Sequence, residues 1–168
     1  MANTYTLISS NVLSSSAASV TFSAIPATYT DLVLRCSARS DAASAQEVIY
    51  INPNTLTTNQ TSRILEGNGA NGAGSSATSR IETRGVGANA TANTFSSSET
   101  YIPNYASASV HPISSFGVGE NNSDVAVMNS VASLWNSATA ISSISITRAI
   151  GSNFVSGSSF YLYGIKSS

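Results

Sequence analysis

The last strand-like segment of the chain is the feature that most constrains its fold. Residues Phe160–Ile165 follow a Ser/Gly turn and alternate strictly between two sets of side chains. One face of the segment carries Phe160, Leu162 and Gly164, and the residues between them point the opposite way. A two-residue alternation of large side chains is typical of a β-strand. This segment shows no helical periodicity of similar quality. We therefore expect the chain to finish inside a sheet, with this strand closing a single β-domain.

Short runs of the same kind recur along the rest of the chain, separated by clusters of Ser, Asn, Gly and Pro. That spacing is typical of an antiparallel sandwich rather than of alternating βαβ units. The sequence therefore predicts an all-β fold, a single-domain antiparallel β-sandwich of jelly-roll type that spans residues 1–168. The expected strands are Tyr5–Ser9, Val20–Ala24, Asp31–Arg39, Glu47–Asn52, Ser62–Leu65, Ser79–Arg84, Phe95–Ile102, Ser109–Gly119, Val125–Trp135, Ile141–Arg148 and Phe160–Ile165.

Two segments lack the alternation of the expected strands. Ser40–Glu47 contains residues that cap helices and several alanines, which indicates one or two helical turns with few large apolar residues to dock them. Gly67–Ser79 is a long polar stretch rich in Gly and Ser, and we expect it to be a loop.

Chain length and cysteine content indicate a packed core without disulfides. A single domain of 168 residues buries about two-thirds of the surface that its unfolded chain exposes. Cys36 is the only cysteine, so no intrachain disulfide can form, and its phase with Leu32 and Leu34 predicts a buried structural thiol. The predicted core consists of Phe22, Leu32, Leu34, Cys36, Trp135, Ile144, Ile146, Phe160 and Leu162.

The chain carries few charges. Asp, Glu, Lys and Arg make up 9% of it, against about 25% of an ordinary globular domain. The net charge is −1 and the basic residues are scattered singly, which disfavours nucleic acid and anionic membranes as partners. The amino end has neither the basic nor the apolar region of a signal peptide, and no apolar run approaches the length of a membrane span. We therefore expect a protein made in the cytoplasm that does not insert into membranes.

A glycine motif imitates a dinucleotide-binding fingerprint. Residues Gly67–Gly72 satisfy G-x-G-x-x-G after an expected strand. The fingerprint also requires an apolar helix after the glycines, which packs on the sheet and presents its N-terminus to the pyrophosphate. The residues that follow, 73–79, include no large apolar side chain. We interpret the motif as a turn and predict no cofactor.

The sequence contains no recognisable catalytic or metal-binding constellation. His111 is the only histidine and has no nucleophile motif beside it, so we interpret it as a partly exposed, non-catalytic imidazole. One histidine and one cysteine do not make a His/Cys zinc site, and residues 120–124 lack the spacing of a calcium loop. A glycosidase-type pair of carboxylates would have to come from Glu82, Glu99, Glu120 and Asp124. We interpret these acids as solvated charges.

Aromatic side chains supply the remaining candidate for a binding surface. Trp135 is in phase with Val127 and Val131, which predicts a position in the core. The alternative is a sugar-stacking platform, which would consist of Tyr101, Tyr105, Trp135, Tyr161 and Tyr163.

Five segments together carry a resemblance to a known class of protein. They are residues 65–69, 102–107, 133–137, 141–146 and 151–166, and the closing Phe-Tyr-Leu-Tyr-Gly-Ile-Lys strand is the most specific of them. In the order of these segments and in its closing strand, the chain resembles small virion structural proteins of tailed bacteriophages, including cyanophages. The resemblance implies a jelly-roll domain that decorates heads or sits at fibre and tail tips, commonly as a homotrimer, and that is not an enzyme.

Two roles stay open within this resemblance. A capsid decoration or cement protein would bind the major capsid protein on the outside of the head and stabilise it. A tail-fibre or receptor-binding tip would recognise host-surface glycan, and an enzyme acting on host polysaccharide is a third, less favoured role. A tip protein normally carries an N-terminal shaft, whereas the first expected strand begins at Tyr5, so we favour decoration. The expected partners are then the major capsid protein, or another virion protein, and further copies of the chain, and the expected location is the virion.

Overall fold

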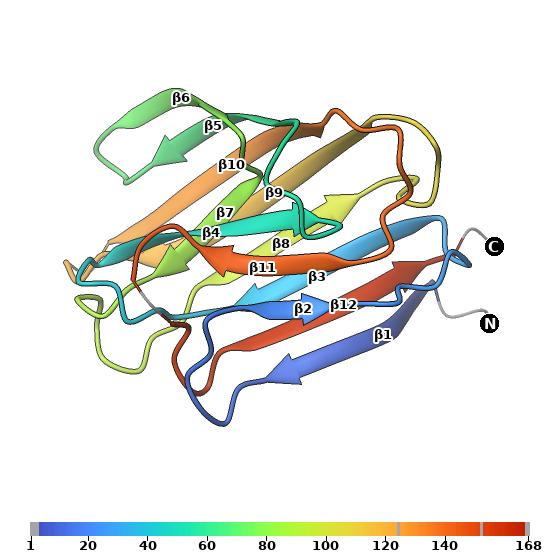
Figure 1. Ribbon diagram of the computed structural model, residues 1–168. Coiled ribbons are helices and arrows are strands. Elements are labelled where there is room, and N and C mark those ends of the chain that lie inside the picture. The colour runs from blue at the N-terminus through green and yellow to red at the C-terminus, as the bar shows by residue number, and fades with distance from the viewer. Residues whose placement is uncertain (1–3, 124, 152, 167–168) are drawn as a thin grey trace.

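Two antiparallel β-sheets pack face to face in the protein (Figure 1). The structure is a computed structural model, and it describes residues 4–123, 125–151 and 153–166. The larger sheet has eight strands in the order β1-β12-β3-β8-β9-β10-β5-β6, and the smaller has four in the order β2-β11-β4-β7. Within the described ranges there is no helix long and apolar enough to cross a membrane. The predicted all-β antiparallel sandwich is confirmed.

Every expected strand is present, with its ends shifted by a few residues, and one strand was not expected. The strands are β1 (Tyr5–Val12), β2 (Val20–Phe22), β3 (Asp31–Ser37), β4 (Gln46–Pro53), β5 (Gln60–Gly67), β6 (Gly72–Thr78), β7 (Glu82–Val86), β8 (Ser97–Ile102), β9 (His111–Glu120), β10 (Ala126–Trp135), β11 (Ile144–Arg148) and β12 (Ser159–Ile165).

The predicted loop over residues 67–79 is wrong for most of its length, because it contains β6. This strand pairs with β5 over seven residues. Apart from Ala77, all of its side chains are exposed, on both faces of the sheet. A strand that buries one small side chain needs no apolar alternation, because backbone pairing with its neighbour holds most of it in place. Its sequence therefore lacks the signal on which a strand prediction depends.

The helical turns predicted over Ser40–Glu47 are also absent. Apart from one tight turn, in which Ser44 N donates to Ala42 O, the backbone of this segment bonds to distant strands and loops. Ser40 N donates to Val86 O at 2.9 Å, and Asp41 N donates to Asn153 O at 3.0 Å. Tertiary partners for the backbone outweigh a local helical preference of only a few residues, since so short a helix is marginal by itself.

The core lies between the two sheets and contains every predicted core residue. The most exposed of them retains 4% of its surface, and Trp135 and Leu162 are completely buried. Phe154 and Phe160 meet edge to face with their ring centroids 5.1 Å apart. The strand phases taken from the sequence are therefore confirmed for the inner faces of both sheets.

Glycines let the two sheets approach closely where β7 crosses β9. A Cβ on Gly117 would lie 2.7 Å from the backbone nitrogen of Arg84 and 2.8 Å from Asn129 Oδ1, well inside van der Waals contact. All five residues of β7 are buried as a result of this crossing. A glycine at position 117 is thus a condition for seating β7 against the larger sheet.

We expect Gly117→Ala to lower the free energy of unfolding by about 1–3 kcal/mol, because the added methyl group must displace backbone atoms. Urea denaturation measures the change. Gly74→Ala is the matched control, because the nearest atom to an added Cβ there is 3.7 Å away, an ordinary contact. Equal losses in the two variants would contradict the close crossing.

Candidate interaction surface

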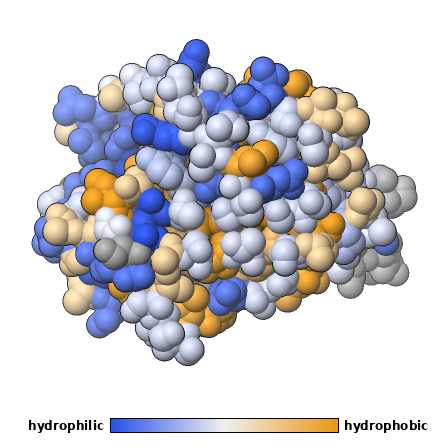
Figure 2. Space-filling model, in the orientation of Figure 1, coloured by the Kyte–Doolittle hydropathy of each residue, from blue (hydrophilic) through white to orange (hydrophobic). Residues whose placement is uncertain are grey.

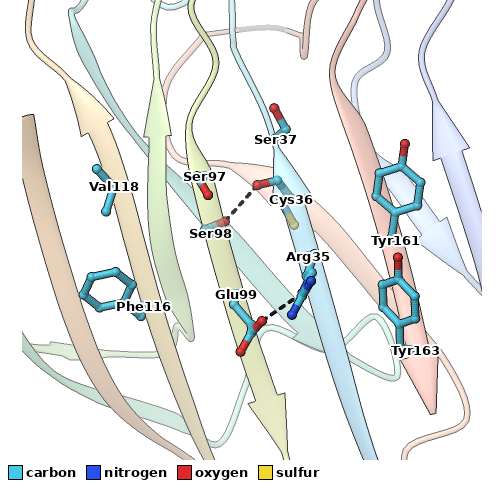
Figure 3. A pocket seen from close by; sticks show the side chains of 10 residues that line it. All are labelled: Arg35, Cys36, Ser37, Ser97, Ser98, Glu99, Phe116, Val118, Tyr161 and Tyr163. Carbon is cyan, nitrogen blue, oxygen red and sulfur yellow. Dashed lines mark hydrogen bonds and ion pairs between the residues drawn. The ribbon is translucent and has the colours of Figure 1, made fainter. Parts of the chain in front are cut away.

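The side of the larger sheet that faces away from the smaller sheet, here called the outer face, is the candidate site. Cross-strand register aligns Tyr161, Arg35, Glu99 and Phe116 in one row across β12, β3, β8 and β9. In Figure 3 the tyrosine rings rise from β12 on one side and Phe116 rises from β9 on the other, with the Arg35–Glu99 pair between them. The β8–β9 hairpin and two strands that are distant from it in sequence, β3 and β12, thus build one surface.

A shallow groove of about 450 Å³ lies along this row. Its floor includes the small side chains of Ser37 and Ser97, and Tyr161 and Phe116 are among the residues of its walls. Arg35 Nε donates to Glu99 Oε2 at 2.8 Å, and both side chains are exposed. Because the two charges are paired, the groove presents hydrogen-bonding groups without a net charge.

Exposed apolar side chains gather on the outer face. Alternation places them there, because residues whose neighbours point into the core must point outward. The opposite side of the molecule, where the smaller sheet lies in front in Figure 2, is dominated by residues of intermediate hydropathy. The large apolar side chains on the outer-facing positions that remain at least about a third exposed are Tyr5, Leu7, Val12, Leu65, Tyr101, Phe116, Met128 and Leu134.

His111 is buried, not partly exposed as predicted. Only 1% of its surface is accessible, and its ring stacks on Trp135 with centroids 5.5 Å apart. Its Nε2 lies 3.1 Å from the carbonyl oxygen of Thr139. The reason is register, because His111 begins the inward phase of β9 and lies directly opposite Trp135 of β10. The interpretation of His111 as non-catalytic stays a prediction.

The candidate acids have separate partners. Glu99 pairs with Arg35 on the outer face, as described, whereas Glu120 accepts hydrogen bonds from Thr94 Oγ1 and from the backbone nitrogen of Asn122. Glu82 is buried beside Arg80, so its interpretation as a solvated charge is wrong. Among the described residues no group of three or more His, Cys, Asp or Glu side chains could hold a metal ion. The remaining candidate, Asp124, lies outside the described residues.

Sequence reasoning missed a buried carboxylate at Glu47. It accepts hydrogen bonds from Val48 N at 2.8 Å, Ser40 Oγ at 3.1 Å and Ile150 N at 3.2 Å. Burial raises the pKa of this carboxyl, and the hydrogen bonds oppose that shift. Its phase with Ile49, on the inward side of β4, was the available signal. The contacts tie β4 to two neighbouring loops, which is a structural role.

Cys36 and the glycine motif are placed as predicted. Cys36 is buried, and burial raises its pKa to about 12, so the thiol stays protonated at neutral pH and is no nucleophile. Residues 67–72 form the hairpin turn between β5 and β6, in which Asn68 Oδ1 accepts a hydrogen bond from Asn71 N at 2.8 Å. The residues after this turn form β6 rather than a helix, so the features of a dinucleotide site are missing there.

The five aromatic residues divide between core and surface. Trp135 and Tyr105 are completely buried, which confirms the core position predicted for Trp135. Tyr101 on β8, with Tyr161 and Tyr163 on β12, lies on the outer face, where Tyr101 Oη donates to Asp31 Oδ2 at 2.6 Å. Sequence reasoning missed Phe116, whose available signal was a large aromatic side chain at an outward position of β9.

Comparisons with known proteins add little to these observations. No family model matches the chain, and neither does any curated protein. Among solved structures, an exo-inulinase from Aspergillus awamori is similar over 96% of this chain, with a TM-score of 0.49 and 11% sequence identity. The match covers 29% of the exo-inulinase chain. A likeness at this level carries no argument about function.

Proposed function

We propose that this chain is a structural protein of a tailed-bacteriophage virion, which decorates the outside of the head, binds the major capsid protein and stabilises the shell. The resemblance of its closing strand supports the virion assignment. The structural observation that supports an interaction role is the outer face, where apolar side chains remain exposed over several strands. Large apolar side chains left exposed together on one face of a protein are typical of an interaction site.

The composition of the outer face suits a protein partner. Aromatic residues and methionine are enriched at the centres of protein interfaces, whereas charged residues are depleted there. Phe116, Tyr101 and Met128 follow this pattern. The charges at the centre, Arg35 and Glu99, neutralise each other, so a partner would not need to supply a counter-charge.

The rest of the surface also favours dense packing. Ser, Thr, Asn and Ala predominate over Lys and Glu in the chain. Such side chains lose little conformational entropy when neighbours immobilise them, and they leave few charges to desolvate. The lower cost in entropy and desolvation counts at every contact, so its effect is largest in a shell of many copies. The homotrimer implied by the resemblance stays a prediction within this proposal.

The experiment that tests the docking face is Phe116→Glu, introduced into the phage. A carboxylate at the centre of an apolar interface would be buried without a partner, so we expect occupancy of the head to fall at least about tenfold. Leu56→Glu is the matched control, since Leu56 lies in the loop between β4 and β5 and its exposure of 47% is close to the 50% of Phe116. Quantitative mass spectrometry of purified particles measures occupancy. Undiminished occupancy of Phe116→Glu would contradict docking through the outer face.

The groove favours one alternative function, a receptor-binding tip that recognises host-surface glycan. Tyr161 and Phe116 offer apolar ring faces on which sugar rings can stack. Arg35 and Glu99 offer donors and acceptors for sugar hydroxyls beside them. The two functions differ in where the protein lies on the particle and in how many copies each particle holds.

A further inference from the structure

The free edge of β6 is the basis of this inference. β6 is the last strand of the larger sheet, and it pairs with β5 on one side only. No other described strand pairs with its second side, so that side leaves backbone N–H and C=O groups open for pairing. Figure 1 shows the β5–β6 hairpin at the end of the larger sheet, beyond the strands of the smaller one.

The other three sheet edges carry features that hinder pairing. β1 is interrupted by an irregular register between Leu7 and Ser9. β2 has only three residues, and β7 is buried throughout. Bulges, short strands and coverage are among the usual means by which proteins block edge-to-edge association. β6 has regular register over seven residues and contains no charged residue or proline, so its edge is open.

We propose that this edge pairs with the β6 of a second copy of the chain, antiparallel and about a two-fold axis at Ser75. In that register Gly72 lies opposite Thr78, Ala73 opposite Ala77 and Gly74 opposite Ser76 of the other copy. All seven residues are then paired, and opposite side chains share a face, as the pleat requires. The larger sheets of the two copies become one continuous sheet.

The side chains of β6 suit pairing with a second copy, because each residue near a two-fold axis faces its own counterpart or a close neighbour of it. A charged residue near the axis would face its own counterpart and repel it, and β6 has none. Its Gly, Ala, Ser and Thr side chains are small enough for two strands to meet without steric conflict. The pairing also accounts for Leu65, which is 66% exposed and whose side chain lies against Gly74, toward the open edge. In the pair this side chain approaches Ser76 of the second copy and loses contact with water.

Self-pairing does not depend on the proposed function, because it is a property of the purified protein. A shell that holds many copies side by side would strengthen it by raising the local concentration. If the chain also forms a homotrimer through another surface, β6 pairing links two trimers. The number of chains joined at each β6 edge is two in either case.

The first test is Ser75→Cys in the purified protein under mild oxidation. Opposite Cβ atoms of antiparallel strands lie about 4.5–5.5 Å apart, which a disulfide can approach with little adjustment. We expect a two-chain band on a denaturing, non-reducing gel, and Cys36 does not compete because it is buried. Ser130→Cys is the matched control, an exposed serine on β10 within the same sheet, and it should give no such band. Equal bands from both variants, or none from Ser75→Cys, would overturn the proposal.

The second test uses charge at the same position. Ser75→Lys and Ser75→Glu each place like charges opposite one another, so each alone should self-associate at least about tenfold more weakly than wild type. Mixing the two variants pairs opposite charges and should restore association, as measured by sedimentation equilibrium. If the mixture associates no more strongly than either variant alone, a two-fold axis at Ser75 is excluded. If wild-type protein shows no association that depends on β6, self-pairing is refuted. This result would be independent of where the protein lies on particles.

Discussion

Leu162→Ala should lower the free energy of unfolding by about 2–5 kcal/mol. Leu162 is completely buried on the inner face of β12, and it pairs directly with Leu34 of β3. Truncation removes apolar contacts and leaves a cavity that β-strands held from both sides cannot collapse to fill. A domain of this size is stable by only about 5–15 kcal/mol, so this single change should remove a large share of its stability.

The control for Leu162→Ala is the same substitution at Leu56, a largely exposed leucine in the loop between β4 and β5. Surface truncations of that kind change stability by less than about 0.5 kcal/mol. Urea denaturation at low protein concentration measures both variants, and similar m-values would show that the change lies in stability rather than in compactness. A loss below about 1 kcal/mol for Leu162→Ala would contradict its position at the centre of the core.

The largest functional effect is expected on the heads of particles. If the chain is a decoration protein, purified particles should contain it at hundreds of copies, all on the outside of the head. Heads stripped of it should release DNA at a lower temperature, because a ligand that binds only the assembled lattice stabilises it by mass action. Quantitative mass spectrometry and particle reconstruction measure the copies, and DNA release during heating measures the stability.

Adding purified protein back to stripped heads supplies the control for this measurement. Wild-type protein should restore the release temperature, whereas Phe116→Glu should not, since it places a carboxylate among the apolar side chains of the outer face. A count of only a few copies per particle, all at the tail end, would instead support receptor binding. The groove between Tyr161 and Phe116 would then be the first place to test for glycan binding.

The sequence by itself determined the fold class and the inward faces of the strands. A two-residue period is a property of the strand backbone. The alternation within residues 160–165 is therefore enough to predict which side chains face the core and which face outward. Trp135, Cys36 and Leu162 are buried as their phases predicted. Part of the candidate site follows from the same rule, because Tyr161 and Tyr163 occupy the outward phase of β12.

Tertiary structure alone decided how these faces are combined. Glu99 and Phe116 come from the consecutive strands β8 and β9, whereas Arg35 and Tyr161 come from strands far away in the sequence. Only the strand order aligns all four in one row. His111 shares the inward phase of β9, and only the register with β10 places its ring against Trp135.

β6 shows the same limit most clearly. Its strand is held by backbone pairing to β5, and backbone groups are the same in every residue except proline, so its sequence carries almost no record of the pairing. Side-chain periodicity indicates which residues a segment buries, and it gives no strand signal in β6, where Ala77 is the one buried residue. The open edge therefore became visible only when the strands were assembled into a sheet.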